Sequence, residues 1–256
     1  MKKMPYAFSS LLVFLFVLAA CTHLPEQSVQ KTETGTISAI TEADFRICDP
    51  CTRNQAQGWA AAAGRGDGPS ALKAANCYAF LVRQGKDKTL RLADAVKGRK
   101  LAEAAVIMFP KSGLAHYLYA YLTGLQAEND PLRGLELVPV IEHEAALAAK
   151  FNPEVNGAGP DRMLGELYLR APGAPLSIGD LEKAAAHYRR AIAIAPKHIE
   201  NQLGLVETLI EEDEDEEACA HLHGLLSGMR PARSSETSWH KILGLLKRLC
   251  SMRDSE

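Results

Sequence analysis

The sequence predicts an all-α fold, a right-handed superhelical stack of antiparallel helix pairs closed by a C-terminal capping helix. Three observations predict it. Apolar residues recur at the i, i+3, i+4 spacing of a helix, and few stretches alternate with period two. The chain is rich in alanine and leucine. Pro110, Pro153 and Pro196 follow one another at intervals of 43 residues, and an internal period of this size is typical of stacked helical pairs.

The N-terminus has the layout of an export signal. Lys2 and Lys3 precede an apolar run from Phe8 to Ala20, which is shorter than the ~20 residues a membrane-spanning helix needs. The sequence Leu18-Ala19-Ala20-Cys21 resembles a bacterial lipobox, which implies cleavage before Cys21 and lipid on its thiol and new amino group. The alternative is an ordinary secretory signal with an incidental cysteine at the boundary.

We therefore expect residues 1–20 to be a lipoprotein signal peptide and residues 21–38 to hold the lipidated cysteine and a polar, flexible tether. Several acyl chains hold a protein firmly on a membrane that it does not span. The residue after Cys21 is Thr22 and not an aspartate. By the same resemblance, this favours a lipid-anchored protein of the outer membrane that faces the periplasm.

Residues 39–256 are predicted to form the repeat domain. The stretch "GDLEKAAAHYRRAIAIAP" (179–196) places Ala184, Tyr188 and Ala191 before Pro196, in steps of four, three and five residues. These steps put the three anchors on one helical face, and the proline ends the helix. The same steps recur twice upstream, and the first two recur downstream before Pro231: Gly98, Ala102, Ala105, Pro110; Ile141, Ala145, Ala148, Pro153; Ala218, Leu222, Leu225.

The order small, aromatic, small, proline resembles the second half of a tetratricopeptide repeat, and Leu164-Gly165-x₂-Tyr168 resembles its first half. Tyr188 is then an interhelical knob, and we expect the charged residues beside it (His187, Arg189, Arg190) to be solvated. The period exceeds the usual ~34 residues. We expect the surplus in extended loops at 125–137 and 170–180, the second acting either as a recognition element or as a rigid connector.

The tyrosine-rich stretch "AHYLYAYLTG", the segment "LELVPVIEHEAALAAKFNP" and the glycine-rich turn before a Leu-Gly helix resemble T-component lipoproteins of tripartite ATP-independent periplasmic (TRAP) transporters. The resemblance covers roughly residues 70–230. It implies a protein partner, the periplasmic solute-binding subunit, and homo-oligomers with a hydrophobic cleft. The concave surface of such repeats would present Tyr117, Tyr121, Arg162, Glu166, Arg170, Leu203 and Glu207. The alternative for the tyrosines is a place in the core.

Six cysteines are present. If Cys21 carries lipid, five remain for disulfides in an exported compartment: Cys48, Cys51, Cys77, Cys219 and Cys250. One candidate bridge joins Cys48 or Cys51 to Cys77, and another joins Cys219 to Cys250; buried free thiols are the alternative. The spacing Cys48-x-x-Cys51 also leaves a thiol oxidoreductase open, although no βαβ pattern surrounds it.

Other activities find little support. The net charge of −2 provides no basic field for nucleic acid. His221 and His223 are two residues apart, so they do not face each other on a helix. We therefore expect no catalysis, no metal and no cofactor, and a solvated turn at the acidic residues 211–217.

A C-terminal helix is predicted over 235–250, with one apolar stripe formed by Trp239, Ile242, Leu243, Leu246 and Leu249. Such a stripe favours a cap on the end of the stack, or else a contact between copies. The predicted function is a protein-binding lipoprotein. The rival within this class is a scaffold for envelope assembly, in pilus, secretion or outer-membrane biogenesis machinery.

Overall fold

The computed structural model describes residues 45–228 and 236–250, and side chains of the second range from residue 240 onward. The predicted signal peptide (residues 1–20) and the predicted lipidated Cys21 and tether (residues 21–38) lie outside these residues. No helix in the described ranges is both long enough and apolar enough to cross a membrane. The helices are α1 (Arg53–Ala63), α2 (Gly68–Gln84), α3 (Lys88–Met108), α4 (Gly113–Asn129), α5 (Pro131–Phe151), α6 (Val155–Arg170), α7 (Leu181–Ile194), α8 (Ile199–Glu211), α9 (Asp215–Gly228) and α10 (Glu236–Leu249).

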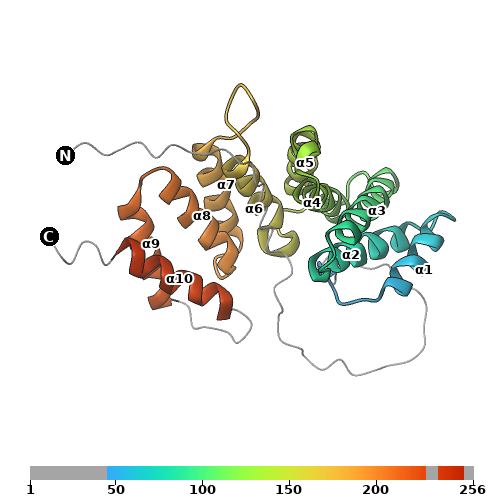
Figure 1. Cartoon of the computed structure of the whole chain (residues 1–256), viewed down its shortest axis with the longest axis horizontal. Helices are drawn as coiled ribbons and strands as arrows, with labels where there is room; N and C mark the ends of the chain where they lie inside the picture. The colour runs from blue at the N-terminus through green and yellow to red at the C-terminus, as the bar shows by residue number, and fades with distance from the viewer. Residues whose placement is uncertain (1–44, 229–235, 251–256) are drawn as a thin grey trace.

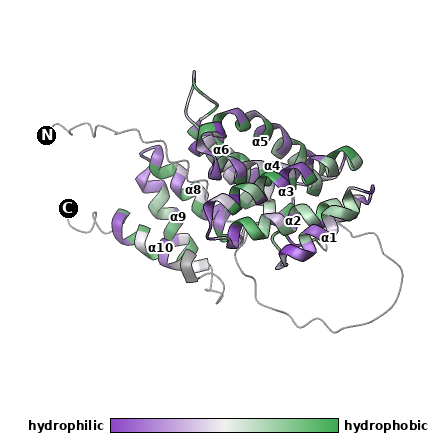
Figure 2. Ribbon diagram, turned by 45° about the vertical axis from the view of Figure 1, so that its right-hand side comes forward, coloured by the Kyte–Doolittle hydropathy of each residue, from purple (hydrophilic) through white to green (hydrophobic). Residues whose placement is uncertain are grey.

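The predicted all-α stack is confirmed. The pairs α2/α3, α4/α5, α6/α7 and α8/α9 follow one another along the molecule, with α1 at one end and α10 at the other (Figure 1). Hydrophilic and hydrophobic residues alternate along the ribbon of α5 (Figure 2). This is expected for a helix that packs one face on its neighbours and turns the other face to water.

The repeated anchors form the buried faces of the second helices, as predicted. Their burial follows from the steps of four and three, which keep them on one face. Each helix ends two residues before its proline: α3 at Met108, α5 at Phe151 and α7 at Ile194. The buried anchors are Gly98, Ala102, Ala105, Ile141, Ala145, Ala148, Ala184, Tyr188, Ala191, Ala218, Leu222 and Leu225.

Of the two extended loops predicted within the helix pairs, the structure contains one. The prediction of an extended loop at 125–137 was wrong, because α4 runs to Asn129 and α5 begins at Pro131. Proline is accepted at the first helical position, where its missing N–H has no partner to lose, so the surplus residues lengthen the helices. The loop at 170–180 does form. It is closed by the Gly179 N–H donating to the Pro172 carbonyl at 2.8 Å, and it projects above α6 and α7 in Figure 1.

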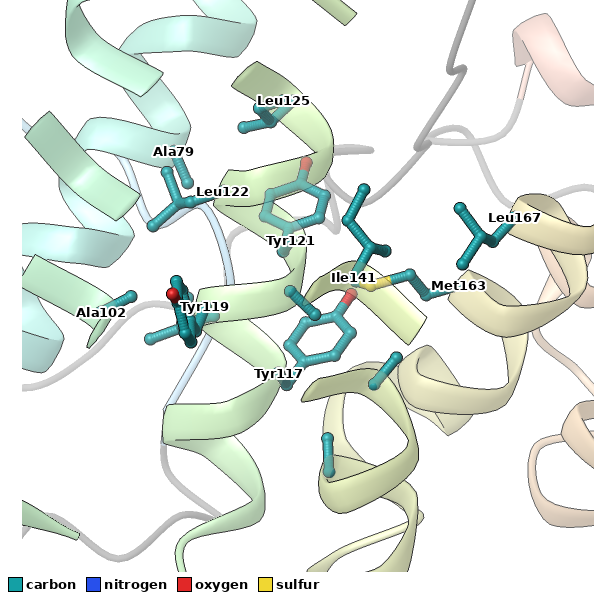
Figure 3. Packing of buried hydrophobic residues seen from close by; sticks show 14 of the residues in the cluster. Ala79, Ala102, Tyr117, Tyr119, Tyr121, Leu122, Leu125, Ile141, Met163 and Leu167 are labelled. Atoms are coloured by element: carbon teal, nitrogen blue, oxygen red, sulfur yellow. The ribbon is translucent and has the colours of Figure 1, made fainter. Parts of the chain in front are cut away.

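Helix α4 is the centre of the larger core, and all its residues except Glu128 are buried. In Figure 3, Leu122 and Tyr119 lie on the side of Ala79 and Ala102, whereas Tyr117 lies beside Ile141 and Met163. A second core, around Tyr188 and Leu222, is formed by α7 to α10. The stack is therefore held together by contacts between consecutive pairs.

The C-terminal helix packs on this second core. Ile242 is fully buried and Leu246 and Leu249 are partly buried. The predicted stripe was wrong at one position: Leu243 is 53% exposed, and Leu245 is buried in its place. The side chain of Trp239 lies outside the described part. A disulfide between Cys219 and Cys250 joins α9 to the end of α10.

Candidate functional site: the inner face of the repeat stack

The first helices of successive pairs, α2, α4, α6 and α8, contact one another along one side of the stack, which we call the inner face. The seven residues predicted to form a groove all lie on these helices. Only Arg170 and Glu207 keep appreciable side-chain exposure, 33% and 19%. The others are buried: Tyr117, Tyr121, Arg162, Glu166 and Leu203. The expectation of an accessible tyrosine surface is therefore corrected in favour of the core alternative.

Polar contacts between α2 and α4 form the first part of the inner face. Arg83 Nε donates to the Tyr121 hydroxyl at 2.9 Å, and its guanidinium lies over the Tyr121 ring. Glu128 accepts from Arg91 at 3.2 Å and contacts Arg83 at 3.5 Å. Burial raises the pKa of Glu128 against the opposing influence of the two arginines.

A short segment before α1 covers this part. The Asn76 side chain accepts from the Cys48 N–H at 2.7 Å and donates to the Arg46 carbonyl at 2.7 Å. Phe45 and Ile47 pack against the larger core, and Cys48 Sγ lies 3.8 Å from the Tyr121 hydroxyl. Asn76 therefore binds a stretch of backbone through both halves of its amide.

The start of α6 is strained. Asn156, Gly157 and Ala158 all have positive φ, between 52° and 61°, a conformation that costs energy for residues other than glycine. Arg162 holds this turn by donating to the carbonyls of Asn156 and Gly157, both at 2.9 Å. Arg162 also donates to Asn201 of α8 at 2.8 Å, so the turn is tied to the next repeat.

His198 lies against this turn. A Cβ added to Gly157 would stand 2.4 Å from His198 Cδ2, so the close approach requires glycine. Burial, with a further contribution from Arg162, lowers the pKa of His198 to about 3. The imidazole is therefore neutral at physiological pH.

Tyr188 joins the inner face from α7. Its hydroxyl donates to Glu166 at 2.7 Å, and Arg170 Nε contacts the other Glu166 oxygen at 3.0 Å. Arg170 also pairs with Glu207, which pairs with Lys241 of α10. Burial raises the pKa of Glu166 although Arg170 opposes it. These hydrogen bonds and ion pairs link side chains of α6, α7, α8 and α10. Their buried residues, Glu166 and Tyr188, hold the helices together.

Two of the charged residues beside Tyr188 are paired with the buried carboxylate of Asp161. His187, whose side chain is 16% exposed, corrects the expectation of solvation, whereas Arg190, 52% exposed, fits it. Asp161 Oδ1 lies 2.8 Å from His187 Nδ1 and 3.1 Å from Arg190 Nε. Burial acts to raise the pKa of Asp161, but these hydrogen bonds and charges lower it below its usual range. Arg189 fits the expectation, in an exposed pair with Glu217.

The cysteines are brought together across helices. Cys51 is bonded to Cys77 of α2, and Cys219 to Cys250. Cys51 thus bonds a cysteine outside the Cys48-x-x-Cys51 motif, which weighs against the oxidoreductase alternative.

His223 lies beside the second disulfide, and its nearest ring nitrogen and the two sulfurs are within 4.8 Å of one another. Because both sulfurs are bonded to each other, this group offers a metal only the imidazole.

Sequence reasoning missed the residues that position this face: Asn76, Asn156, Asp161, His198 and Asn201. The available signal was a polar residue on a helical face that is otherwise apolar. Asn76, for example, directly follows the buried Ala75 and is three residues before the buried Ala79. That signal does not say which distant carbonyl or hydroxyl the side chain meets.

The fold and the inner face define a helical-repeat protein whose first helices are joined by buried polar contacts. A tetratricopeptide repeat family model matches residues 176–229, which include the whole of α7, α8 and α9. These residues are therefore a tetratricopeptide-type repeat, as the anchor pattern predicted. No curated protein shows a significant match to the chain. The resemblance to TRAP T-components stays a prediction.

Proposed function

We propose that the protein is a non-catalytic, protein-binding lipoprotein of the cell envelope, an accessory subunit that docks a solute-binding protein of a TRAP-type transporter. The observation that carries the coarser part is the tetratricopeptide repeat over 176–229, because stacked repeats of this kind present extended surfaces to other proteins. The lipobox at Cys21 and the resemblance over 70–230 support the finer part.

The edge formed by connections within pairs is a candidate contact surface. Leu132, just after the α4–α5 connection, is 95% exposed, and Leu176, in the α6–α7 loop, is 76% exposed. Connections within successive pairs lie on the same edge of such a stack, because every pair is antiparallel and follows the last. Exposed leucines on one edge support a protein contact there.

The test is in-cell crosslinking in the native host, followed by mass spectrometry. We expect an extracytoplasmic solute-binding protein to be recovered, and Leu176→Asp to reduce its yield severalfold. Ile107→Asp is the matched control, since Ile107 is 77% exposed but lies near the end of α3, at the opposite edge. Secretin, pilus or barrel-assembly components without a binding protein would support the scaffold alternative.

A further inference from the structure

Three side chains of metal-ligating type meet at the C-terminal end of the stack. One ligand atom each of Cys219, His223 and Cys250 lies within 4.8 Å of the other two. In a tetrahedral zinc site, Zn–S bonds of ~2.3 Å and Zn–N bonds of ~2.1 Å hold neighbouring ligand atoms about 3.6–3.8 Å apart. In the part of the chain that the structure describes, no other three potential ligands come this close together. The three side chains are therefore near the positions that a zinc ion requires.

The two helices that carry these residues fix their positions. Cys219 and His223 are four residues apart in α9, so their side chains lie on the same helical face. Cys250 follows directly after α10, and its N–H donates to the Leu246 carbonyl at 2.9 Å. Its backbone thus continues the last turn of that helix, while the buried Ile242 packs α10 on the second core. The ligand positions therefore rest on helix geometry and packing as well as on the disulfide.

The surroundings also suit a cation. His223 is exposed and the two cysteines are half-buried, which leaves the fourth position of a tetrahedral ion to water. The seven residues 211–217 are all acidic, and the exposed Asp215 lies one helical turn before Cys219 on the same face. Negative charge at this range raises the local concentration of divalent cations.

A metal at this place belongs to the dithiol form of the protein, because zinc binds thiolates and not a disulfide. Disulfides form over seconds to hours, so a newly exported chain carries thiols first, and a dithiol reductant regenerates them. In that exchange the dithiol gives two electrons to the Cys219–Cys250 bond. The S–S bond breaks, two thiolates form, and the dithiol becomes a disulfide. Its two protons pass to solvent when zinc binds the thiolates.

We propose that Cys219, His223 and Cys250 form a zinc site in the dithiol form, and that zinc and the disulfide are alternative links between α9 and the end of α10. This departs from the sequence-based expectation that the chain binds no metal. That expectation weighed His223 only against His221, whereas the folded chain brings Cys250 to it from another helix. The proposal goes beyond the proposed function and is independent of which protein the stack binds.

Zinc binding is measured on the full-length chain after reduction with a phosphine, in competition with a chromogenic zinc chelator. We expect the reduced chain to bind one zinc ion more than its Cys219→Ser, Cys250→Ser variant, and the disulfide forms of the two proteins to bind equally. His223→Ala should weaken this site by about tenfold or more, since even the loss of a residue that only supports a ligand has an effect of that size. His143→Ala is the matched control, because His143 is an exposed histidine on another helix.

Hydrogen exchange measured by mass spectrometry locates the site. In the reduced chain, zinc should slow exchange in residues 240–250 severalfold, and a chelator should reverse the effect. The His223→Ala variant should lose this protection in its reduced form. Its disulfide form should exchange like that of wild type, which shows that the substitution leaves the fold intact.

Equal zinc stoichiometry in the reduced wild type and the Cys219→Ser, Cys250→Ser variant would overturn the proposal. So would zinc that binds without protecting residues 240–250, or a His223→Ala variant that behaves like His143→Ala. Crosslinking to a protein partner in the host would survive each of these results, so this proposal and the proposed function fail separately.

Discussion

At the scale of single residues, Tyr188 shows how closely the repeats pack. Its ring enters a slot between α6 and α8 lined by Gly165 and Gly204. A Cβ added at either position would lie 2.9 Å and 2.0 Å, respectively, from the tyrosine ring. The two glycines are needed because a large knob can approach a helix backbone only where no side chain stands. The hydroxyl then completes the hydrogen bonding of buried Glu166.

The substitution Tyr188→Phe tests this arrangement. It keeps the ring but removes the donor to Glu166, and leaving a buried charged group short of a partner costs about 1–3 kcal/mol. We expect urea denaturation to show a loss of this size. Tyr168→Phe is the matched control, because its acceptor Glu142 is only partly buried. Equal losses in both variants would contradict the interpretation.

His198 predicts a pH dependence of stability. Its pKa falls from about 6.5 in the unfolded chain to about 3 when folded. Between these values the unfolded state binds the proton and the folded state does not, so stability falls as pH falls from about 6.5 toward 3. The slope for one such group approaches about 1.4 kcal/mol per pH unit.

The measurement compares wild type with His198→Gln by urea denaturation at pH 7 and pH 4.5. The variant should lose less stability between the two pH values, because glutamine does not titrate. His221, whose pKa burial also lowers, and the buried carboxylates stay in both proteins. Comparing the slopes, and not the absolute stabilities, therefore isolates His198. Identical slopes would show that His198 does not contribute.

At the scale of elements, the C-terminal helix is held by a small apolar contact, in which Ile242 and Leu245 are buried. It contacts α8 and α9 through one apolar stripe, and the Cys219–Cys250 disulfide closes a loop of 31 residues over that contact. Closing a loop of this length stabilises a fold by roughly 3–4 kcal/mol in the chain-entropy description. The disulfide and the stripe thus act together as a cap.

Replacing Cys219 and Cys250 with alanine should loosen α10 before any other helix. Hydrogen exchange measured by mass spectrometry should show faster exchange in residues 240–250 and little change in α4. Replacing Cys51 and Cys77 is the control, since that disulfide lies at the other end of the stack and should leave α10 unchanged. Uniformly faster exchange throughout the chain would contradict a local cap.

At the scale of the whole molecule, each end of the stack carries a disulfide bond. Cys51–Cys77 joins the segment before α1 to α2, and Cys219–Cys250 joins α9 to the end of α10. Terminal repeats lack a neighbour on one side, so they need another source of stability. Disulfides persist in exported compartments, which agrees with the export signal predicted at the N-terminus.

The lipid anchor is the prediction that belongs to this scale. Cys21→Ser removes the thiol that would be acylated, and one or more lost chains leave too little apolar surface to hold the protein on a bilayer. We expect the variant to move from the membrane fraction to the soluble fraction when cells are fractionated. Unchanged membrane association would rule out Cys21 as the anchor.

Much of the fold could be predicted because the second helices carry their information locally. The steps of four and three, followed by proline, identify both the buried face and the end of a helix within eighteen residues. The connection at Asp130 could not be predicted in the same way. Pro131 is compatible with a loop and with the first turn of a helix, and only packing of α5 on α4 separates the two.

The candidate site was less predictable, because its contacts join distant parts of the chain. Arg162 meets Asn201 39 residues later, and Tyr117 meets Asn156 across the same separation. By itself, the sequence determined the helical class, the anchors and the ends of the second helices, since these follow from spacing along one helix. Only the tertiary structure decided that the inner tyrosines are core, that Asp161 holds His187 and Arg190, and that Cys51 bonds Cys77. Burial and pairing depend on which helices become neighbours, and no local pattern specifies that.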